Sequence, residues 1–105
     1  MALSIMTTVD DELGIVVAAT GEVDVSCASE LRDAIDAAVA GDASSVTIDL
    51  AEVPYIDSTG IGVLVGAAHR GTDEGKTVRV ANPQRNVRRV LDMLGVTGEL
   101  GIDEA

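Results

Sequence analysis

Short apolar stretches with a two-residue period alternate along this chain with segments whose apolar residues recur every three or four positions. The first pattern is typical of β-strands and the second of amphipathic helices. We expect extended segments over residues 3–9, 13–20, 22–25, 46–50 and 77–81. This alternation predicts an α/β fold in which about three main helices pack on a mixed sheet of four to five strands.

The first two expected helices have clear start signals. Ser26 is a good N-cap for the first helix, because its hydroxyl can accept a hydrogen bond from a free amide, and Gly41 is a plausible stop. The second helix is expected to begin at Ser58 or Thr59 and to end at about Arg70, where a polar, glycine-containing loop follows.

The third helix is expected to begin with Asn82 as its cap and Pro83 as its first residue, where the missing N–H costs nothing. Gly95 is expected to end it. The apolar residues of the three helices that share a face, and that we expect to be buried, are Leu31, Ala34, Ile35, Ala38, Val39, Ile61, Leu64, Val65, Ala68, Val87, Val90, Leu91 and Leu94.

The composition predicts one domain with an aliphatic core. A chain of 105 residues fits a single compact unit, so we expect residues 1–105 to form one domain. Apolar residues make up 47% of the chain, which is enough for a core at this length. Tyr55 is the single aromatic residue, so the chain lacks the aromatic platforms on which single-stranded nucleic acids stack.

The formal net charge of −11 argues against nucleic acid and anionic membrane surfaces as partners. Arg85, Arg88 and Arg89 form a small basic cluster, which we interpret as a solvated helix face. The longest apolar run, Ile61–Ala68, has eight residues, far fewer than the roughly 20 that span a bilayer. The N-terminus has no signal-peptide pattern, so the sequence predicts a soluble protein of the cytoplasm.

The sequence contains little that indicates a catalytic, metal or cofactor site. With one cysteine, Cys27, and one histidine, His69, the chain cannot form an internal disulfide or a multi-histidine metal site, and we expect no cofactor. Ser58 and His69 would lie roughly 16 Å apart on one helix, too far for nucleophile activation. Cys27 is interpreted either as a redox sensor near a helix start or as a small half-buried residue.

Two phosphate-binding patterns are incomplete. Gly75-Lys76-Thr77 resembles the end of a P-loop, but Arg70 occupies the position of the required glycine and a strand follows. Gly60, Gly62 and Gly66 resemble a dinucleotide fingerprint, but position 65 is valine where the third glycine belongs. Nucleotide binding is therefore a weak third hypothesis.

Residues 49–62 carry the most specific pattern, Asp-Leu-Ala-Glu-Val-Pro-Tyr-Ile-Asp-Ser-Thr-Gly-Ile-Gly. Residues 21–24 add Gly-Glu-Val-Asp, and residues 91–95 fit a Leu-x-x-x-Gly helix ending. Together these motifs resemble the signature of anti-sigma factor antagonists (anti-anti-sigma factors), which have STAS domains. The resemblance covers essentially the whole chain and implies a STAS-like fold.

The resemblance also implies a bacterial partner-switching cycle. The unphosphorylated protein would bind an anti-sigma factor that is also a serine kinase, which frees the sigma factor for transcription. Phosphorylation of the serine that matches Ser58 would end this binding, and a serine phosphatase would reverse it. The chain would then be a substrate of these enzymes rather than an enzyme, and we expect it to be monomeric when free.

The residues expected at the partner surface surround Ser58. Asp24 matches an acidic interface residue of the family, and Asp57 matches the acid before the phosphorylated serine. The whole expected surface is Asp24, Asp57, Ser58, Thr59, Gly60, Gly62, Val63 and Gly66. A serine at a helix N-terminus is a suitable position for a switch. The helix dipole stabilises a phosphate there, so the fold tolerates the modification. The phosphate adds about −1.5 to −2 charges, which would disrupt an interface that covers it.

Two alternatives remain open. Glycines in an exposed helix cost about 1 kcal/mol each relative to alanine, so Gly62 and Gly66 either let a partner approach or let the helix pack closely on its own neighbour. Likewise, Ser58 could be only a helix cap. In that case the chain would be a non-phosphorylated STAS scaffold or a subunit of a transport complex.

Overall fold

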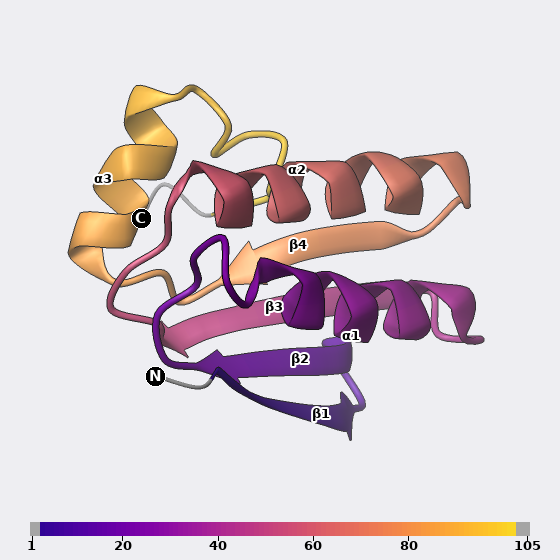
Figure 1. Ribbon diagram of the computed structural model, residues 1–105. Coiled ribbons are helices and arrows are strands. Elements are labelled where there is room, and N and C mark those ends of the chain that lie inside the picture. Colours follow the sequence, from indigo (N-terminus) through magenta and orange to yellow (C-terminus); the bar gives the residue numbers. More distant parts are fainter. Residues whose placement is uncertain (1–2, 103–105) are drawn as a thin grey trace.

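The computed structural model describes residues 3–102, which form a four-stranded sheet in the order β1-β2-β3-β4 and three helices (Figure 1). The strands are β1 (Ser4–Asp10), β2 (Gly14–Thr20), β3 (Ser45–Glu52) and β4 (Thr77–Ala81). The helices are α1 (Ala28–Ala40), α2 (Ser58–Asp73) and α3 (Arg85–Met93). The predicted α/β fold with a mixed sheet is confirmed.

A hairpin joins β1 to β2, which are antiparallel. The side chain of Asp10 shapes its turn, since Oδ1 accepts hydrogen bonds from the amides of Glu12 (2.8 Å) and Leu13 (2.9 Å). The pairs β2–β3 and β3–β4 are parallel, so the carboxyl ends of these three strands lie at one edge of the sheet (Figure 1).

Residues 22–25 do not form the fifth strand that their pattern allowed. Val23 alone pairs, in an isolated parallel bridge with Ile56. The chain turns immediately afterwards, because the Asp24 carbonyl accepts hydrogen bonds from the amides of Cys27 (3.1 Å) and Ala28 (2.8 Å). The sheet of the described residues therefore has four strands.

Aliphatic side chains fill the space between the sheet and helices α1 and α2, which both lie against the same face (Figure 1). The largest fully buried side chains are Leu31, Ile35, Ile48, Leu50, Leu64, Leu91, Leu100, Val17, Val23, Val46, Val53 and Thr47. The aliphatic core expected from the composition is confirmed. The edge strand β1 is more exposed than its alternation suggested, and Val9 is 84% exposed.

Ser26 is not the N-cap of α1, which corrects the sequence-based expectation. The cap position belongs to Cys27, whose side chain makes no capping hydrogen bond. The Ser26 hydroxyl instead donates a hydrogen bond to Oδ1 of Asp24 at 2.5 Å. A hydrogen bond to a carboxylate is stronger than one between neutral groups, so the Ser26 hydroxyl bonds to Asp24 and does not cap the helix.

Helix α2 begins at Ser58 as predicted but ends at Asp73 rather than near Arg70. The expected loop start, Gly71, is a buried residue of the helix. A Cβ at this position would lie 2.4 Å from Cγ2 of Val78 on β4. Gly71 thus permits close packing of α2 on the sheet and does not break the helix.

The expected start of α3 is also wrong. The helix begins at Arg85, with Gln84 in the cap position. Asn82 has a φ of 56°, a left-handed conformation that asparagine tolerates, and its side-chain amide donates to Oδ1 of Asp49 at 3.3 Å. Asn82 therefore turns the chain at the end of β4 and does not cap the helix.

Helix α3 packs through a narrow face. Val87 and Leu91 are buried as expected, whereas Val90 is 38% and Leu94 57% exposed. Val90 and Leu94 stay exposed because α3 covers the end of the sheet and does not lie on one of its faces (Figure 1).

Candidate functional site

The two signature motifs lie side by side at the carboxyl edge of the parallel strands, where α2 begins (Figure 1). Backbone hydrogen bonds join them: the Gly21 amide donates to the Glu52 carbonyl (3.1 Å), and the Val23 amide donates to the Tyr55 carbonyl (2.9 Å). The Asp57 amide donates in turn to the Val23 carbonyl (3.0 Å). The turn after β2 and the loop before α2 therefore form one surface.

Asp57 connects this turn to the helix. It is the N-cap of α2, and its Oδ1 accepts a hydrogen bond from the Gly60 amide at 3.0 Å. Its Oδ2 accepts one from the Val25 amide at 3.2 Å. The carboxylate also complements the positive end of the α2 dipole. Asp57 thus fixes both the start of α2 and its position against the Val25 turn.

Ser58 and Thr59 are the first two residues of α2, and both are exposed. Because Asp57 supplies the cap, the Ser58 hydroxyl is not needed for capping. The first amides of any helix have no partner within the helix, so a phosphate on Ser58 would meet free donors and a favourable dipole.

Asp24 is partly exposed, and its carboxylate is held in a local turn. Oδ1 accepts hydrogen bonds from the hydroxyl of Ser26 (2.5 Å) and from its amide (2.9 Å). These two donors, the hydroxyl first, lower the pKa of Asp24 below its ordinary value. Asp24 therefore stays negatively charged beside the surface that carries Ser58.

Gly60 lies at the same helix start but is buried. A Cβ at this position would lie 2.6 Å from Cγ1 of Ile56 and 2.7 Å from Cγ1 of Val23. Packing within the chain therefore explains this glycine, because the absence of a side chain lets α2 approach the Val23–Ile56 bridge.

Gly62 has a different environment. It is exposed, and a Cβ added to it would meet no atom within 4 Å. At Gly66 a Cβ would meet only Nη1 of Arg70, at 3.3 Å, and Val63 between them is half-buried. Close packing within the chain therefore does not explain Gly62. Of the two explanations considered for this glycine, the close approach of a partner is the one that is left.

Cys27 and His69 have structural partners. Cys27 is buried, and its thiol donates to the Glu22 carbonyl at 3.2 Å. His69 is exposed on α2, and its Nε2 lies 3.4 Å from Oε2 of Glu99. Within residues 3–102, no three His, Cys, Asp or Glu side chains are grouped closely enough to hold a metal ion. The same residues include no helix of the length and apolarity that a membrane crossing needs.

Two polar residues that the sequence interpretation overlooked support the loop before Ser58. The Gln84 side-chain amide donates to the Ala51 carbonyl at 2.9 Å, and that of Asn86 donates to the Pro54 carbonyl at 2.7 Å. Their one signal in the sequence is an amide-rich start of the third helix. The start of α3 thus holds the β3–α2 loop in place.

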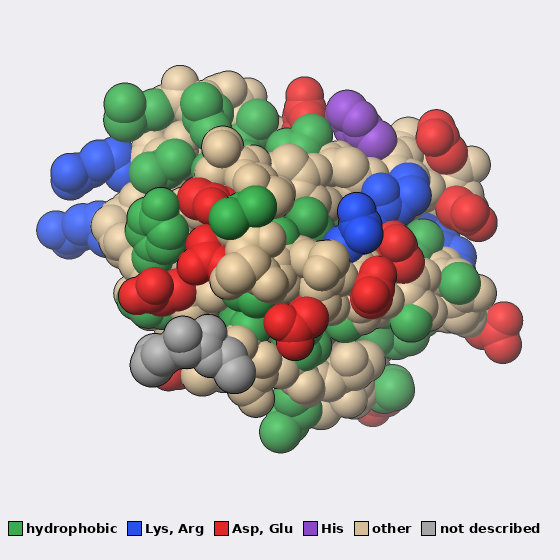
Figure 2. Space-filling view, in the orientation of Figure 1, with side chains coloured by type: hydrophobic (Ala, Val, Ile, Leu, Met, Phe, Trp, Pro, Cys, Tyr) green, Lys and Arg blue, Asp and Glu red, His purple; other side chains and the backbone are tan. Residues whose placement is uncertain are grey.

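Side chains of both charges surround this site. Figure 2 shows Asp and Glu side chains over the starts of α1 and α2, and Lys and Arg side chains project from the end where α3 lies. Over the far ends of α1 and α2, side chains of both signs are mixed. The site thus combines an exposed hydroxyl, nearby carboxylates and an open stretch of small residues on α2.

Comparison with known proteins identifies related chains. The family model described as "Mlab, STAS domain" matches residues 6–102. The anti-sigma-B factor antagonist of Bacillus subtilis (strain 168) is 33% identical over 76 residues, which are 72% of this chain and 69% of that protein.

Solved structures share the fold. The crystal structure of an anti-sigma factor antagonist from Mycobacterium paratuberculosis has a TM-score of 0.82 and 25% identity, covering 99% of this chain and 87% of that one. The unphosphorylated form of the anti-sigma factor antagonist SpoIIAA has a TM-score of 0.74 and 22% identity, covering 97% and 88%. The phosphorylated form of Bacillus SpoIIAA gives 0.68 and 22%, covering 97% and 91%.

Proposed function

Because the chain belongs to the STAS-domain family of anti-sigma factor antagonists, we propose that its unphosphorylated form binds an anti-sigma factor with serine kinase activity. Binding releases the sigma factor, phosphorylation of Ser58 ends the binding, and a serine phosphatase restores it. In this cycle the chain, one STAS domain over residues 1–105, is the substrate of two enzymes and not a catalyst. It acts in the bacterial cytoplasm and is a monomer when free.

The position of Ser58 carries the proposal. It is exposed at the first turn of α2, and the neighbouring Asp57 already supplies the helix cap. A phosphate there is compatible with the fold, since it would lie at the positive end of the helix dipole. SpoIIAA, whose fold is similar, exists in phosphorylated and unphosphorylated forms.

The surroundings of Ser58 favour a partner surface. Gly62 on the open side of α2 leaves room for a partner's backbone, and Gly66 continues this stretch one turn later. The carboxylates of Asp24 and Asp57 on the adjoining turn favour a partner with basic groups at this place. The proposed surface comprises Asp24, Asp57, Ser58, Thr59, Gly62, Val63 and Gly66. Gly60, which the sequence interpretation also placed on this surface, is buried beneath it.

A phosphate would oppose such a complex. It adds about −1.5 to −2 charges beside the carboxylates of Asp24 and Asp57. A covering partner would also have to remove water from the phosphate, which is costly unless the partner offers new cations. Phosphorylation of Ser58 can therefore abolish partner binding while the domain stays folded.

The test uses the full chain together with candidate anti-sigma kinases from the same genome. Intact mass is measured with and without ATP, the modified residue is mapped, and complex formation is followed by size-exclusion chromatography. We expect one phosphate on Ser58 and loss of the complex. A Ser58→Ala variant stays unmodified and bound, whereas a Ser44→Ala control, which alters an exposed hydroxyl outside the proposed surface, behaves as the parent chain.

Binding without modification of Ser58 would refute the switch and favour the alternative function, a constitutive STAS scaffold or transport-complex subunit.

A further inference from the structure

β1 is an edge strand of the sheet, and the described part of the chain leaves its outer side uncovered (Figure 1). It pairs with β2 along its whole length, from Ser4 to Asp10, without a bulge. On the outer side, the N–H and C=O groups of alternate residues point away from β2. Among residues 3–102, no backbone hydrogen bond joins residues 4–10 to an element other than β2. A regular row of free donors and acceptors therefore follows this edge.

The side chains of β1 do not block this edge. Natural edge strands are protected by charged residues, proline, bulges or a covering segment. Residues 3–9 contain no charged residue and no proline, in a chain with seven cationic and eighteen acidic residues. Met6 is 67% exposed and Val9 84%, and the two side chains lie on opposite faces of the strand. β1 thus offers apolar surface on both faces beside its free backbone groups.

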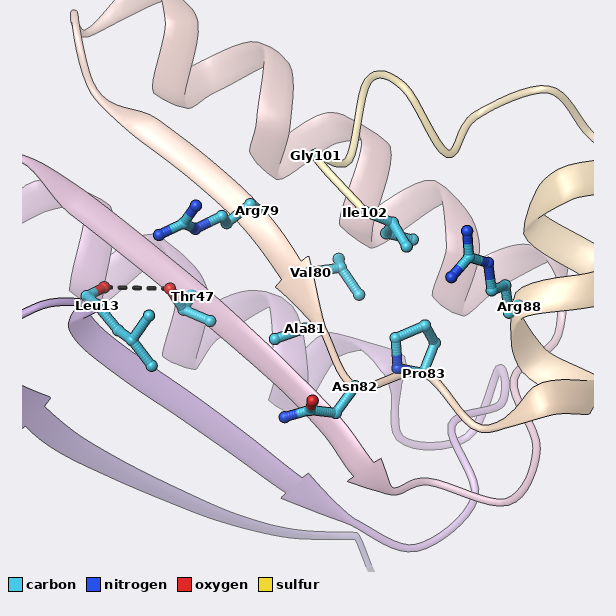
Figure 3. A pocket seen from close by; sticks show the side chains of 10 residues that line it. All are labelled: Leu13, Thr47, Arg79, Val80, Ala81, Asn82, Pro83, Arg88, Gly101 and Ile102. Atoms are coloured by element: carbon cyan, nitrogen blue, oxygen red, sulfur yellow. Dashed lines mark hydrogen bonds between the residues drawn. The ribbon is translucent and has the colours of Figure 1, made fainter. Parts of the chain in front are cut away.

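β4, at the other edge of the sheet, is protected. Its Val80 amide donates to the Leu100 carbonyl at 2.8 Å, and Figure 3 shows Gly101 and Ile102 alongside the strand. Arg79, in the middle of β4, is exposed and places a charge on this edge. The two edges of one sheet therefore differ, and β1 is the one that can accept a further strand.

The hairpin that carries β1 is firmly held. The Leu13 carbonyl in its turn accepts hydrogen bonds from two hydroxyls of β3, those of Thr47 (3.1 Å; Figure 3) and Ser45 (3.3 Å). Gly14 has a φ of 76°, and a Cβ there would lie 2.2 Å from the Ser45 carbonyl oxygen, so glycine permits this approach. A strand that is fixed in advance loses little conformational entropy when another strand pairs with it.

The acidic residues beside β1 indicate the charge of its partner. Asp10, Asp11 and Glu12 lie at the end of the strand, and all three are exposed. The amides of Leu13 and Glu12 lower the pKa of Asp10, so this carboxylate keeps its charge. A second copy of the chain would bring its own net charge of −11 to this edge, and the two copies would repel each other. A segment with basic residues would be attracted.

We propose that the β1 edge binds an extended segment of a partner protein, about seven residues long, whose backbone pairs with Ser4–Asp10 and whose basic end lies beside Asp11 and Glu12. In this mode, called β-augmentation, main-chain hydrogen bonds supply affinity and alternate side chains supply specificity. Apolar or β-branched side chains of the segment would lie beside Met6 and Val9. The site does not depend on the proposed switch, since Ser58 lies on α2 and outside this edge.

The experiment is an NMR titration of the ¹⁵N-labelled full chain with three synthetic peptides. The first contains about seven alternating valine and threonine residues with two lysines at each end. The second has glutamates in place of the lysines, and the third keeps the lysines but has a proline at its centre, which interrupts strand pairing. We expect saturable shifts and slower hydrogen exchange of the β1 amides with the first peptide, and neither with the other two.

Paired charge variants test the basic end of the segment. Asp11→Asn together with Glu12→Gln should weaken binding of the first peptide about fivefold. Asp73→Asn together with Glu74→Gln removes the same charge from an exposed acidic pair at the end of α2 and should leave binding unchanged. Equal weakening by both pairs would reduce the effect to net charge and overturn the placement beside Asp11 and Glu12.

A lysine on the strand tests the edge itself. Met6→Lys should weaken binding of the first peptide at least tenfold, because a charge on an edge strand opposes pairing. Thr77→Lys, at an exposed position of β4, should leave it unchanged. The proposal is overturned if the β1 amides do not shift saturably, or if the glutamate or proline peptide binds equally well. Shifts of the same amides on concentrating the chain alone would assign the edge to a second copy and would also overturn it.

Discussion

Asp57 and Val25 are linked by a hydrogen bond of 3.2 Å between the Oδ2 carboxylate oxygen of Asp57 and the Val25 amide, 32 positions apart in the chain. The other oxygen of the same carboxylate caps α2 through the Gly60 amide. One side chain therefore fixes the helix start and the adjoining turn together. Together with the backbone hydrogen bonds of Val23, this acid therefore helps to position Ser58 on α2 and Asp24 on that turn.

Replacing Asp57 by alanine should destabilise the fold by about 0.5–2 kcal/mol, because the cap and the contact with the Val25 turn are lost together. Asp57→Asn should cost less, since asparagine caps nearly as well and keeps one acceptor oxygen. The measurement is urea unfolding followed by circular dichroism. Asp33→Ala on the exposed side of α1 is the control, and an equal loss of stability there would exclude the capping role.

Gly60 and Gly62 lie in the same turn of α2 but should respond oppositely to alanine. Gly60→Ala places a methyl group within 2.7 Å of Val23 and Ile56, so we expect a loss of about 1–3 kcal/mol. Gly62→Ala meets open space and should gain up to about 1 kcal/mol through helix propensity.

Thermal and urea unfolding of the two variants provide the comparison. For Gly62, a bulkier Gly62→Leu variant should leave unfolding near that of Gly62→Ala while weakening the complex with the anti-sigma partner at least tenfold. Unchanged affinity would remove Gly62 from the proposed partner surface.

The same glycines show how far sequence could predict this protein. Periodicity predicted the four strands and a start of α2 at Ser58 or Thr59, since alternation is a local signal, but it also predicted an extended segment at 22–25 that forms no strand. Gly71 was misread as a helix end because its function depends on Val78, which contacts it from another element. Asn82 was misread as a cap because its partner, Asp49, lies on a neighbouring strand.

The candidate site was predictable in its residues but not in its connections. The motif placed Asp57, Ser58 and Asp24 together, whereas the capping role of Asp57 required the geometry of the Gly60 amide. The supports from Gln84 and Asn86 to the loop before Ser58 carry no periodic signal, because each depends on one side-chain amide reaching a distant carbonyl. Long-range polar contacts of this kind are invisible to a pattern in one sequence.

Ser26→Ala should raise the pKa of Asp24, because the Ser26 hydroxyl is the first of the donors that lower it. A carboxyl group whose pKa is lower in the folded than in the unfolded chain stabilises the fold above its unfolded pKa of about 3.9. That contribution is lost as the pH falls through the folded pKa. The stability of the Ser26→Ala variant should therefore depend less on pH below about pH 4.

Carboxyl ¹³C NMR titration measures the Asp24 pKa directly in both chains. Asp10 serves as an internal reference, since the amides of Leu13 and Glu12 lower its pKa independently of Ser26. An equal change at Asp10 and Asp24 would indicate a global effect of the variant and not loss of the Ser26 donor.

Ser58→Glu should separate folding from partner binding. A negative side chain in the first turn of a helix is stabilising by about 0.3–1 kcal/mol, so the melting temperature should be unchanged or slightly higher. In the complex the same charge would be covered beside Asp57, where like charges repel, and we expect binding to the anti-sigma partner to weaken at least a hundredfold. Ser44→Glu, an exposed serine in the loop before β3, adds the same charge elsewhere and should bind normally. Calorimetric binding curves and melting curves of the three chains provide the measurement, and a Ser58→Glu chain that folds and still binds tightly would show that charge at this position does not control the complex.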